Sequence, residues 1–215
     1  YESILQNPKD TIEFDHKWNA EINDKRNKLG ADGALFNEQN EKIYHVNFIE
    51  KILATVLSKI SNFIPEGGIW MNTQRPEWND ANNALVGNGV SMVTLYYLRR
   101  FLVFFHKLLE TSQKEQIKVS SDLANYYHAI QSALVENKPL LNQSISDTDR
   151  KKILDKLGKA ASDYRQKLYS RGFSGDKATI SLDGLKDFCQ ISLAYFDHTI
   201  KANKREDKLY HAYNL

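Results

Sequence analysis

The sequence is poor in the residues that cross-link or divide a chain. Cys189 is the only cysteine among 215 residues, which excludes an intrachain disulfide, and its place in an apolar helical pattern predicts a small buried hydrophobe. The chain has four prolines and ten glycines, and no stretch rich in proline, glycine and serine divides it. A chain of this length can bury one sizeable core, so we predict a single domain over residues 1–215.

An excess of charge of one sign is also lacking. The chain has 29 Lys and Arg against 27 Asp and Glu, a formal net charge of +2, and the basic residues are spread along the predicted helices. We therefore expect no nucleic-acid partner. The longest apolar stretch, residues 95–109, is interrupted by charged residues such as Arg99 and Lys107, and no signal peptide opens the chain. We expect no membrane span and a soluble protein, cytoplasmic or periplasmic.

The sequence has no recognisable metal or nucleotide motif. Its six histidines show no paired spacing with cysteine or carboxylates, so we predict no structural metal and no cofactor. Gly87 and Gly89 lack the third glycine and the preceding strand of a dinucleotide site, and they are more typical of a loop. The chain begins at Tyr1 rather than Met, which favours a processed form or a piece of a longer polypeptide.

Helical periodicity dominates what is present. Ser91, Ser146 and Ser181 are predicted N-caps, Gly30 is a predicted helix end, and Pro65 is predicted to close a second helix. The predicted helices cover, approximately, residues 9–29, 49–64, 92–109, 123–134, 153–168 and 185–196. Residues 34–46 instead suggest a short hairpin or extended excursion. We therefore predict an all-α fold of antiparallel helical hairpins with this one small β excursion.

One polar segment separates two strongly apolar helices and has an unusual composition. Residues 67–89 contain two tryptophans, one arginine, two carboxylates and six carboxamides. Sugar hydroxyls bind amide, carboxylate and guanidinium groups, and sugar C–H faces stack on aromatic rings. We therefore predict a sugar-binding segment, with these substrate-binding candidates: Trp70, Arg75, Trp78, Asn79, Asn82 and Asn83. The alternative is a polar interhelical loop that satisfies its own backbone.

Glu77 and Asp80 are the catalytic candidates in this segment. Three residues apart, the two carboxylates can face one cavity, and cleavage of a glycosidic bond needs a protonated carboxyl together with a second group. Asp80 could equally accept hydrogen bonds in a turn. Arg75 could position a substrate carboxylate or phosphate, or hold Glu77 in an ion pair.

Residues 77–91 also resemble a known family. Glu-Trp-Asn-Asp-Ala-Asn-Asn at 77–83, followed by Val86-Gly87, Gly89 and Ser91, is similar to the Asp-Trp-Asn-Asp-Gly-x-Asn…Val-Gly…Gly-x-Ser segment of cellobiose-phosphorylase-like enzymes. These belong to the six-hairpin glycosidases, whose catalytic domains are (α/α)6 toroids. The resemblance implies that Asp80 is the general acid. It also implies an oligosaccharide or glycoside substrate, with phosphate as the second reactant in a phosphorylase.

The chain departs from that family in three respects. Glu77 replaces Asp, which keeps the charge, and Ala81 replaces Gly, which restricts the backbone beside the proposed acid. A toroid has twelve helices and we count about six, so the chain would be part of a larger catalytic domain and its partner would be the remainder of the parent chain. Two other interpretations stay open. One is a non-catalytic carbohydrate-binding or structural helical module. The other is a helical interaction protein in which Trp70 and Trp78 are fully buried.

Overall fold

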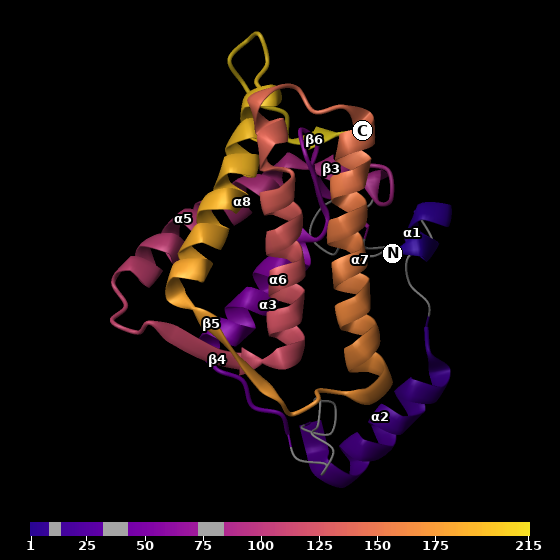
Figure 1. Ribbon diagram of the computed structural model, residues 1–215. Coiled ribbons are helices and arrows are strands. Elements are labelled where there is room, and N and C mark those ends of the chain that lie inside the picture. The colour runs from indigo at the N-terminus through magenta and orange to yellow at the C-terminus, as the bar shows by residue number, and fades with distance from the viewer. Residues whose placement is uncertain (9–13, 32–42, 73–83) are drawn as a thin grey trace.

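The computed structural model describes residues 1–8, 14–31, 43–72 and 84–215. In these residues the fold is mostly helical, with two small antiparallel sheets at opposite ends of the helices (Figure 1). The prediction of a mainly α-helical fold is therefore confirmed. The sheets are an addition that the sequence pattern does not predict.

Serine side chains cap the first turns of four long helices. The helices are α1 (Glu2–Gln6), α2 (His16–Leu29), α3 (Phe48–Ile60), α5 (Met92–Glu110), α6 (Ser121–Glu136), the 3-10 helix η2 (Lys138–Asn142), α7 (Asp147–Arg171) and α8 (Leu182–Ala202). The four with a serine cap are α5, α6, α7 and α8. Ser91, Ser146 and Ser181 each accept a hydrogen bond from a first-turn N–H of α5, α7 and α8 respectively. Such caps satisfy amide groups that have no partner within the helix. All three are the N-caps that the sequence predicts, and Gly30 ends α2 as expected.

The helices pack in antiparallel pairs, and only one of the two main pairs is sequential. α6 and α7, joined through η2, lie side by side, whereas α5 packs most extensively against α8. Strand β4 (Gln116–Ser120) follows α5, and β5 (Lys177–Ser181) precedes α8. The antiparallel pairing of β4 with β5 brings α5 and α8 together (Figure 1). The predicted hairpin arrangement thus holds for α6 and α7, while the α5–α8 pair is non-sequential.

One hydrophobic core connects α3, α5, α6, α7 and α8. Its largest fully buried side chains include Tyr127 from α6, Tyr195 from α8 and Phe105 from α5. Cys189 lies in this core with no exposed surface, which confirms the prediction of a small buried hydrophobe. Burial raises the pKa of its thiol to about 12, so the thiol is neutral at physiological pH.

A second sheet lies at the end of the bundle where α5 begins. Its strand order is β1 (Phe63–Ile64), β2 (Gly68–Trp70), β3 (Val90–Ser91) and β6 (Tyr213–Asn214). The predicted helix over residues 49–64 is therefore wrong at its end. α3 stops at Ile60, because Phe63 and Ile64 pair with Ile69 and Gly68 in the sheet.

The predicted β excursion at residues 34–46 is only partly within the described residues, because residues 34–42 lie outside them. Within 43–46 only Ile43 is in a β-bridge.

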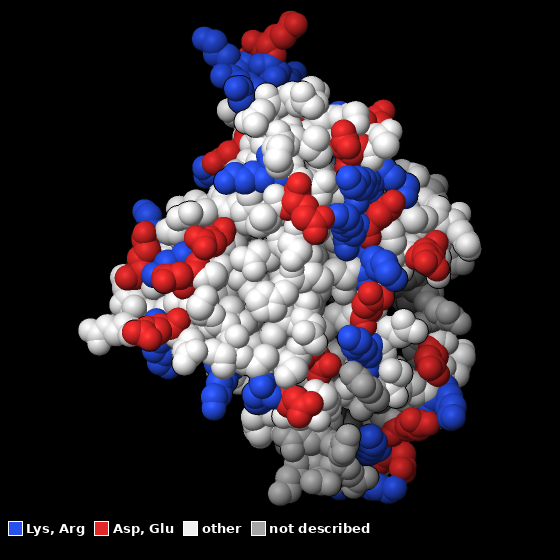
Figure 2. Space-filling view, viewed as in Figure 1, with Lys and Arg blue, Asp and Glu red and all other residues white. Residues whose placement is uncertain are grey.

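Charges of both signs are mixed on the surface. On the face shown in Figure 2, Lys and Arg alternate with Asp and Glu along α7, and the centre of the face, over α6, is largely uncharged. This pattern gives no extended surface of one sign on that face. Within the described ranges, none of the helices combines the length and the apolar character that crossing a bilayer requires.

Candidate functional site

Strands β2 and β3 hold the two ends of the predicted sugar-binding segment together. Trp70 pairs with Val90 in the sheet. Beyond the strands, the Met71 N–H donates to the Gly89 carbonyl at 3.0 Å, and the Gly87 N–H donates to the Met71 carbonyl at 2.6 Å. We call residues 70–72 together with 87–90 the neck. The neck therefore holds residues 70–72 and residues 87–90 against each other beside the sheet.

Trp70 contributes its side chain to the neck. Its indole Nε1 donates to the Gly87 carbonyl at 3.0 Å, and the side chain is only partly buried. Asn72 adds a second cross-link, because its Nδ2 donates to Asn62 Oδ1 at 2.7 Å. The only polar atom of the indole is therefore used within the protein, which leaves the exposed part of the ring for any stacking contact.

The geometry of the neck explains why glycine occupies two positions of the family-like pattern. Gly87 has a φ of +84°, a conformation that favours glycine. A Cβ on Gly89 would lie 2.5 Å from the Cβ of Leu85, so a larger residue would force the turn apart. Ser91 caps α5 through the Thr94 N–H at 3.0 Å. Gly87, Gly89 and Ser91 of the pattern are thus explained by the turn and the helix cap alone.

The remaining predicted site residues lie outside the described residues. These are both catalytic candidates and all substrate-binding candidates except Trp70: Glu77, Asp80, Arg75, Trp78, Asn79, Asn82 and Asn83. Their assignments stay predictions.

The sequence did not draw attention to Glu66, which organises a polar cluster near the same sheet. Its side chain is 9% exposed, and its Oε2 lies 2.9 Å from an Arg150 guanidinium nitrogen. Its Oε1 accepts from the Ile145 N–H at 3.1 Å and lies 2.9 Å from His198 Nε2. Burial raises the pKa of this carboxyl, but the His198 and Ile145 hydrogen bonds and the Arg150 charge lower it by more, so the net shift is downward. The carboxylate is held ionised.

The Glu66 backbone is also tied to the C-terminal end of α8. Its N–H donates to Thr199 Oγ1 at 3.0 Å, and its carbonyl accepts from Asn203 Nδ2 at 2.8 Å. Glu66 has a φ of +59°, an uncommon conformation for a residue with a side chain. These contacts hold it in place and join the β1–β2 turn to α7 and α8.

A shallow pocket of about 600 Å³ opens beside this cluster. It is lined by Glu66, Arg150, His198, Lys201 and a short stretch around Asn142. The Glu66 carboxylate is held ionised by Ile145, Arg150 and His198, so it is not a proton donor at neutral pH. Its contacts make the cluster a link between the β1–β2 turn, α7 and α8. Glu66 followed by Gly67 and Gly68 was a signal for a tight turn, but its partners on α7 and α8 are distant in the sequence.

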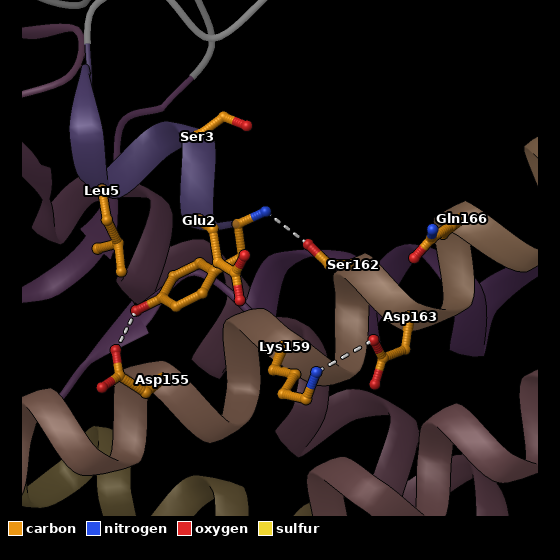
Figure 3. A pocket seen from close by; sticks show the side chains of 9 residues that line it. Glu2, Ser3, Leu5, Asp155, Lys159, Ser162, Asp163 and Gln166 are labelled. Carbon is orange, nitrogen blue, oxygen red and sulfur yellow. Dashed lines mark hydrogen bonds and ion pairs between the residues drawn. The ribbon is translucent and has the colours of Figure 1, made fainter.

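A second pocket, of about 450 Å³, lies between α1 and α7 (Figure 3). The Tyr1 ring crosses α7 at Gly158, and its hydroxyl donates to Asp155 Oδ1 at 2.5 Å. Lys159 and Asp163 form an ion pair along the rim at 3.6 Å. Most of the labelled side chains of α7 contact one another or Tyr1. The pocket is therefore the place where the α1 segment packs against α7.

The described residues contain no group of three or more His, Cys, Asp or Glu that could hold a metal ion. The comparisons with known proteins add no assignment: neither the protein-family models nor the curated protein sequences match this chain.

Proposed function

We propose that this chain is part of a carbohydrate-active enzyme that cleaves glycosidic bonds, with Asp80 as the general acid. The observation that carries the proposal is the sequence of residues 77–83, which combines two carboxylates, a tryptophan and three asparagines. These are the groups that bind sugar hydroxyls and sugar faces and that protonate a leaving oxygen. We further propose that the helical pairs belong to an (α/α)6 toroid completed by the remainder of the parent chain.

Two features of the described residues support the proposal. The neck fixes both ends of the candidate segment on a sheet, and rigid supports are where precise sites are built. The sequential antiparallel pair α6–α7 is the kind of unit from which a helical toroid is made. The glycines and the serine of the family-like pattern carry less weight, because the neck and the α5 cap explain them without a substrate.

The proposed reaction is an inverting displacement. Asp80 protonates the leaving oxygen while water or phosphate attacks the anomeric carbon from the opposite face. A carboxyl that performs this role near neutral pH must have a raised pKa, which a nearby tryptophan and the negative charge of Glu77 would both favour. Arg75 would counter that shift and could instead bind phosphate or a substrate carboxylate.

A non-catalytic carbohydrate-binding module is the second candidate. It is favoured by Trp70, whose indole N–H is used within the neck, so that at least one aromatic residue of the segment has a structural role. Both candidates predict sugar binding, and only the first predicts turnover.

Turnover by the parent protein tests the proposal. The parent protein is incubated with a panel of oligosaccharides in the presence and absence of inorganic phosphate, and free sugar and sugar 1-phosphate are measured. Release of either product, lost in Asp80→Asn, supports an enzyme, and the product identifies hydrolysis or phosphorolysis. Sugar binding without either product would support the binding module instead.

A further inference from the structure

One face of α5 carries an apolar stripe that no other described element covers. Tyr97, Phe104 and Leu108 are 65%, 60% and 42% exposed. Phe101 lies between them, half-buried, with its ring 6.4 Å from that of Phe104 and 5.8 Å from that of the core residue Phe105. The stripe is therefore continuous with the hydrophobic core. A single exposed apolar residue is ordinary, but a contiguous row of three aromatic residues and a leucine marks an interaction surface.

The spacing of the stripe is that of a helix–helix seam. Residues 97, 101, 104 and 108 follow the alternating four-and-three steps of the d and a positions of a heptad. The core-facing residues of α5, among them Leu98, Leu102 and Phe105, lie on an adjacent face of the same helix. α5 thus has one apolar face that packs in this domain and a second one with the geometry to receive another helix.

A basic row borders the stripe. Arg100 and Lys107, seven residues apart, occupy the g positions of the same heptad and are exposed. Neither forms an ion pair within the part of the chain that the structure describes, whereas the adjacent Arg99 is paired with Asp197 at 2.5 Å. In helix–helix seams the g positions select the charge of the partner. Arg100 and Lys107 therefore favour a partner that has carboxylates facing them.

The charge also argues against a second copy of this chain. In an antiparallel pair of α5 helices, Arg100 and Lys107 would face their own counterparts. In a parallel pair Arg100 would face position 105, which is buried in the core of the other copy, and Lys107 would face position 112, beyond the end of α5.

We propose that the α5 stripe is a docking surface for an amphipathic helix of another protein, with apolar residues at its a and d positions and carboxylates facing Arg100 and Lys107. The stripe spans little more than three helical turns, so the contact is small and belongs with transient interfaces. This proposal does not require activity on sugars, but it does require that the remainder of the parent chain leaves the α5 stripe uncovered.

Designed peptides test the proposal directly. One 21-residue peptide has Leu at a and d and Glu at e and g, and its matched control has Lys in place of each Glu. Binding of each fluorescent peptide to the 215-residue chain is measured by anisotropy. We expect the acidic peptide to bind at least about tenfold more tightly than the basic one, and less tightly in high salt.

Three variants locate the site. Phe104→Ala should weaken binding of the acidic peptide by about tenfold or more, since a buried phenylalanine contributes strongly to a small interface. The double variant Arg100→Glu, Lys107→Glu should reverse the preference between the peptides. Val135→Ala, at a 54% exposed apolar residue of α6, is the matched control and should change nothing. Circular dichroism verifies that each variant is folded.

Several results would overturn the proposal. These are equal binding of the two peptides, no binding of either, or affinity unchanged by Phe104→Ala. Self-association of the chain that Phe104→Ala abolishes would assign the stripe to a second copy. Co-sedimentation with phosphatidylserine vesicles that Phe104→Ala abolishes would assign it to a membrane surface.

Discussion

The indole Nε1 of Trp70 donates a hydrogen bond to the Gly87 carbonyl at 3.0 Å and so joins the two sides of the neck. Trp70 was expected to bind substrate, and Gly87 was expected to belong to a loop. Both residues belong to the neck. The relationship implies that Trp70 is a positioning residue for the candidate site, whatever else its exposed edge contacts.

Trp70→Phe should loosen the neck without unfolding the domain. The substitution keeps an aromatic ring and removes the donor, which costs about 1 kcal/mol. Hydrogen exchange should accelerate at the Gly87 amide, which bonds the Met71 carbonyl, and at the Met71 amide. Trp18→Phe in α2 is the control and should leave both amides unchanged. Equal protection of the neck in Trp70→Phe and the wild type would show that the indole bond contributes nothing.

Glu66→Gln should destabilise the fold by about 2–3 kcal/mol at pH 7, because it removes a nearly buried charge from Arg150 and His198. Urea unfolding measures this loss. Asp183→Asn is the control, since the Asp183 side chain is 88% exposed and its pair with Lys186 should contribute little.

The effect of Glu66→Gln should depend on pH. The folded-state pKa of Glu66 is lower than its ordinary value, so folding favours the ionised carboxyl. Its contribution is fully present above the unfolded value of about 4.3 and is lost as the pH falls through the folded pKa. The difference in unfolding free energy between wild type and variant should therefore shrink on acidification below about pH 4.3. A constant difference down to pH 2 would contradict this account of the cluster.

Gly158→Ala should release the α1 segment while leaving α7 intact. A Cβ at this position would lie 2.4 Å from the Tyr1 ring, whereas alanine itself favours a helix interior by about 0.5–1 kcal/mol. Amides of residues 2–6 should exchange faster, with no loss in the midpoint of global unfolding. Tyr1→Phe, which removes only the hydroxyl contact with Asp155, should have a smaller effect. Unchanged exchange in Gly158→Ala would mean that Tyr1 does not dock at this glycine.

Cys189 should resist alkylation in the folded protein. The thiol is fully buried, and burial raises its pKa to about 12, so the reactive thiolate is scarce at pH 8. Iodoacetamide labelling measured by mass spectrometry should be slow in buffer and fast in 8 M urea. Rapid labelling of the folded chain would contradict the burial of α8 against the core.

Local signals in the sequence predicted the helices well. Ser91, Ser146 and Ser181 cap amide groups that lie only three residues further along the chain. The apolar periodicity of α5 is likewise visible within the sequence of the helix alone. The sheets were missed because their strands are only two to five residues long, and because every strand pair except β1–β2 joins segments that are distant in sequence. Phe63 and Ile64 continue the apolar period of α3, yet pairing with Ile69 and Gly68 makes them a strand.

The candidate site could be predicted only in part. Gly87 and Gly89 were correctly assigned to a turn, because glycine indicates backbone conformation locally. The Trp70 hydrogen bond could not be predicted, since it depends on how the neck closes. Glu66 was missed for a similar reason: its partners Arg150 and His198 come from helices 84 and 132 residues further along the chain.

The most direct test of the central claim compares leaving groups in the parent enzyme with Asp80 and with Asp80→Asn. If Asp80 protonates the leaving oxygen, the variant should lose on the order of 10²–10⁴ in kcat on an unactivated disaccharide. It should lose much less on a dinitrophenyl glycoside, whose leaving group needs little protonation, and sugar binding should be retained. Equal losses on the two substrates, or no loss on either, would contradict the assignment of Asp80 as the general acid.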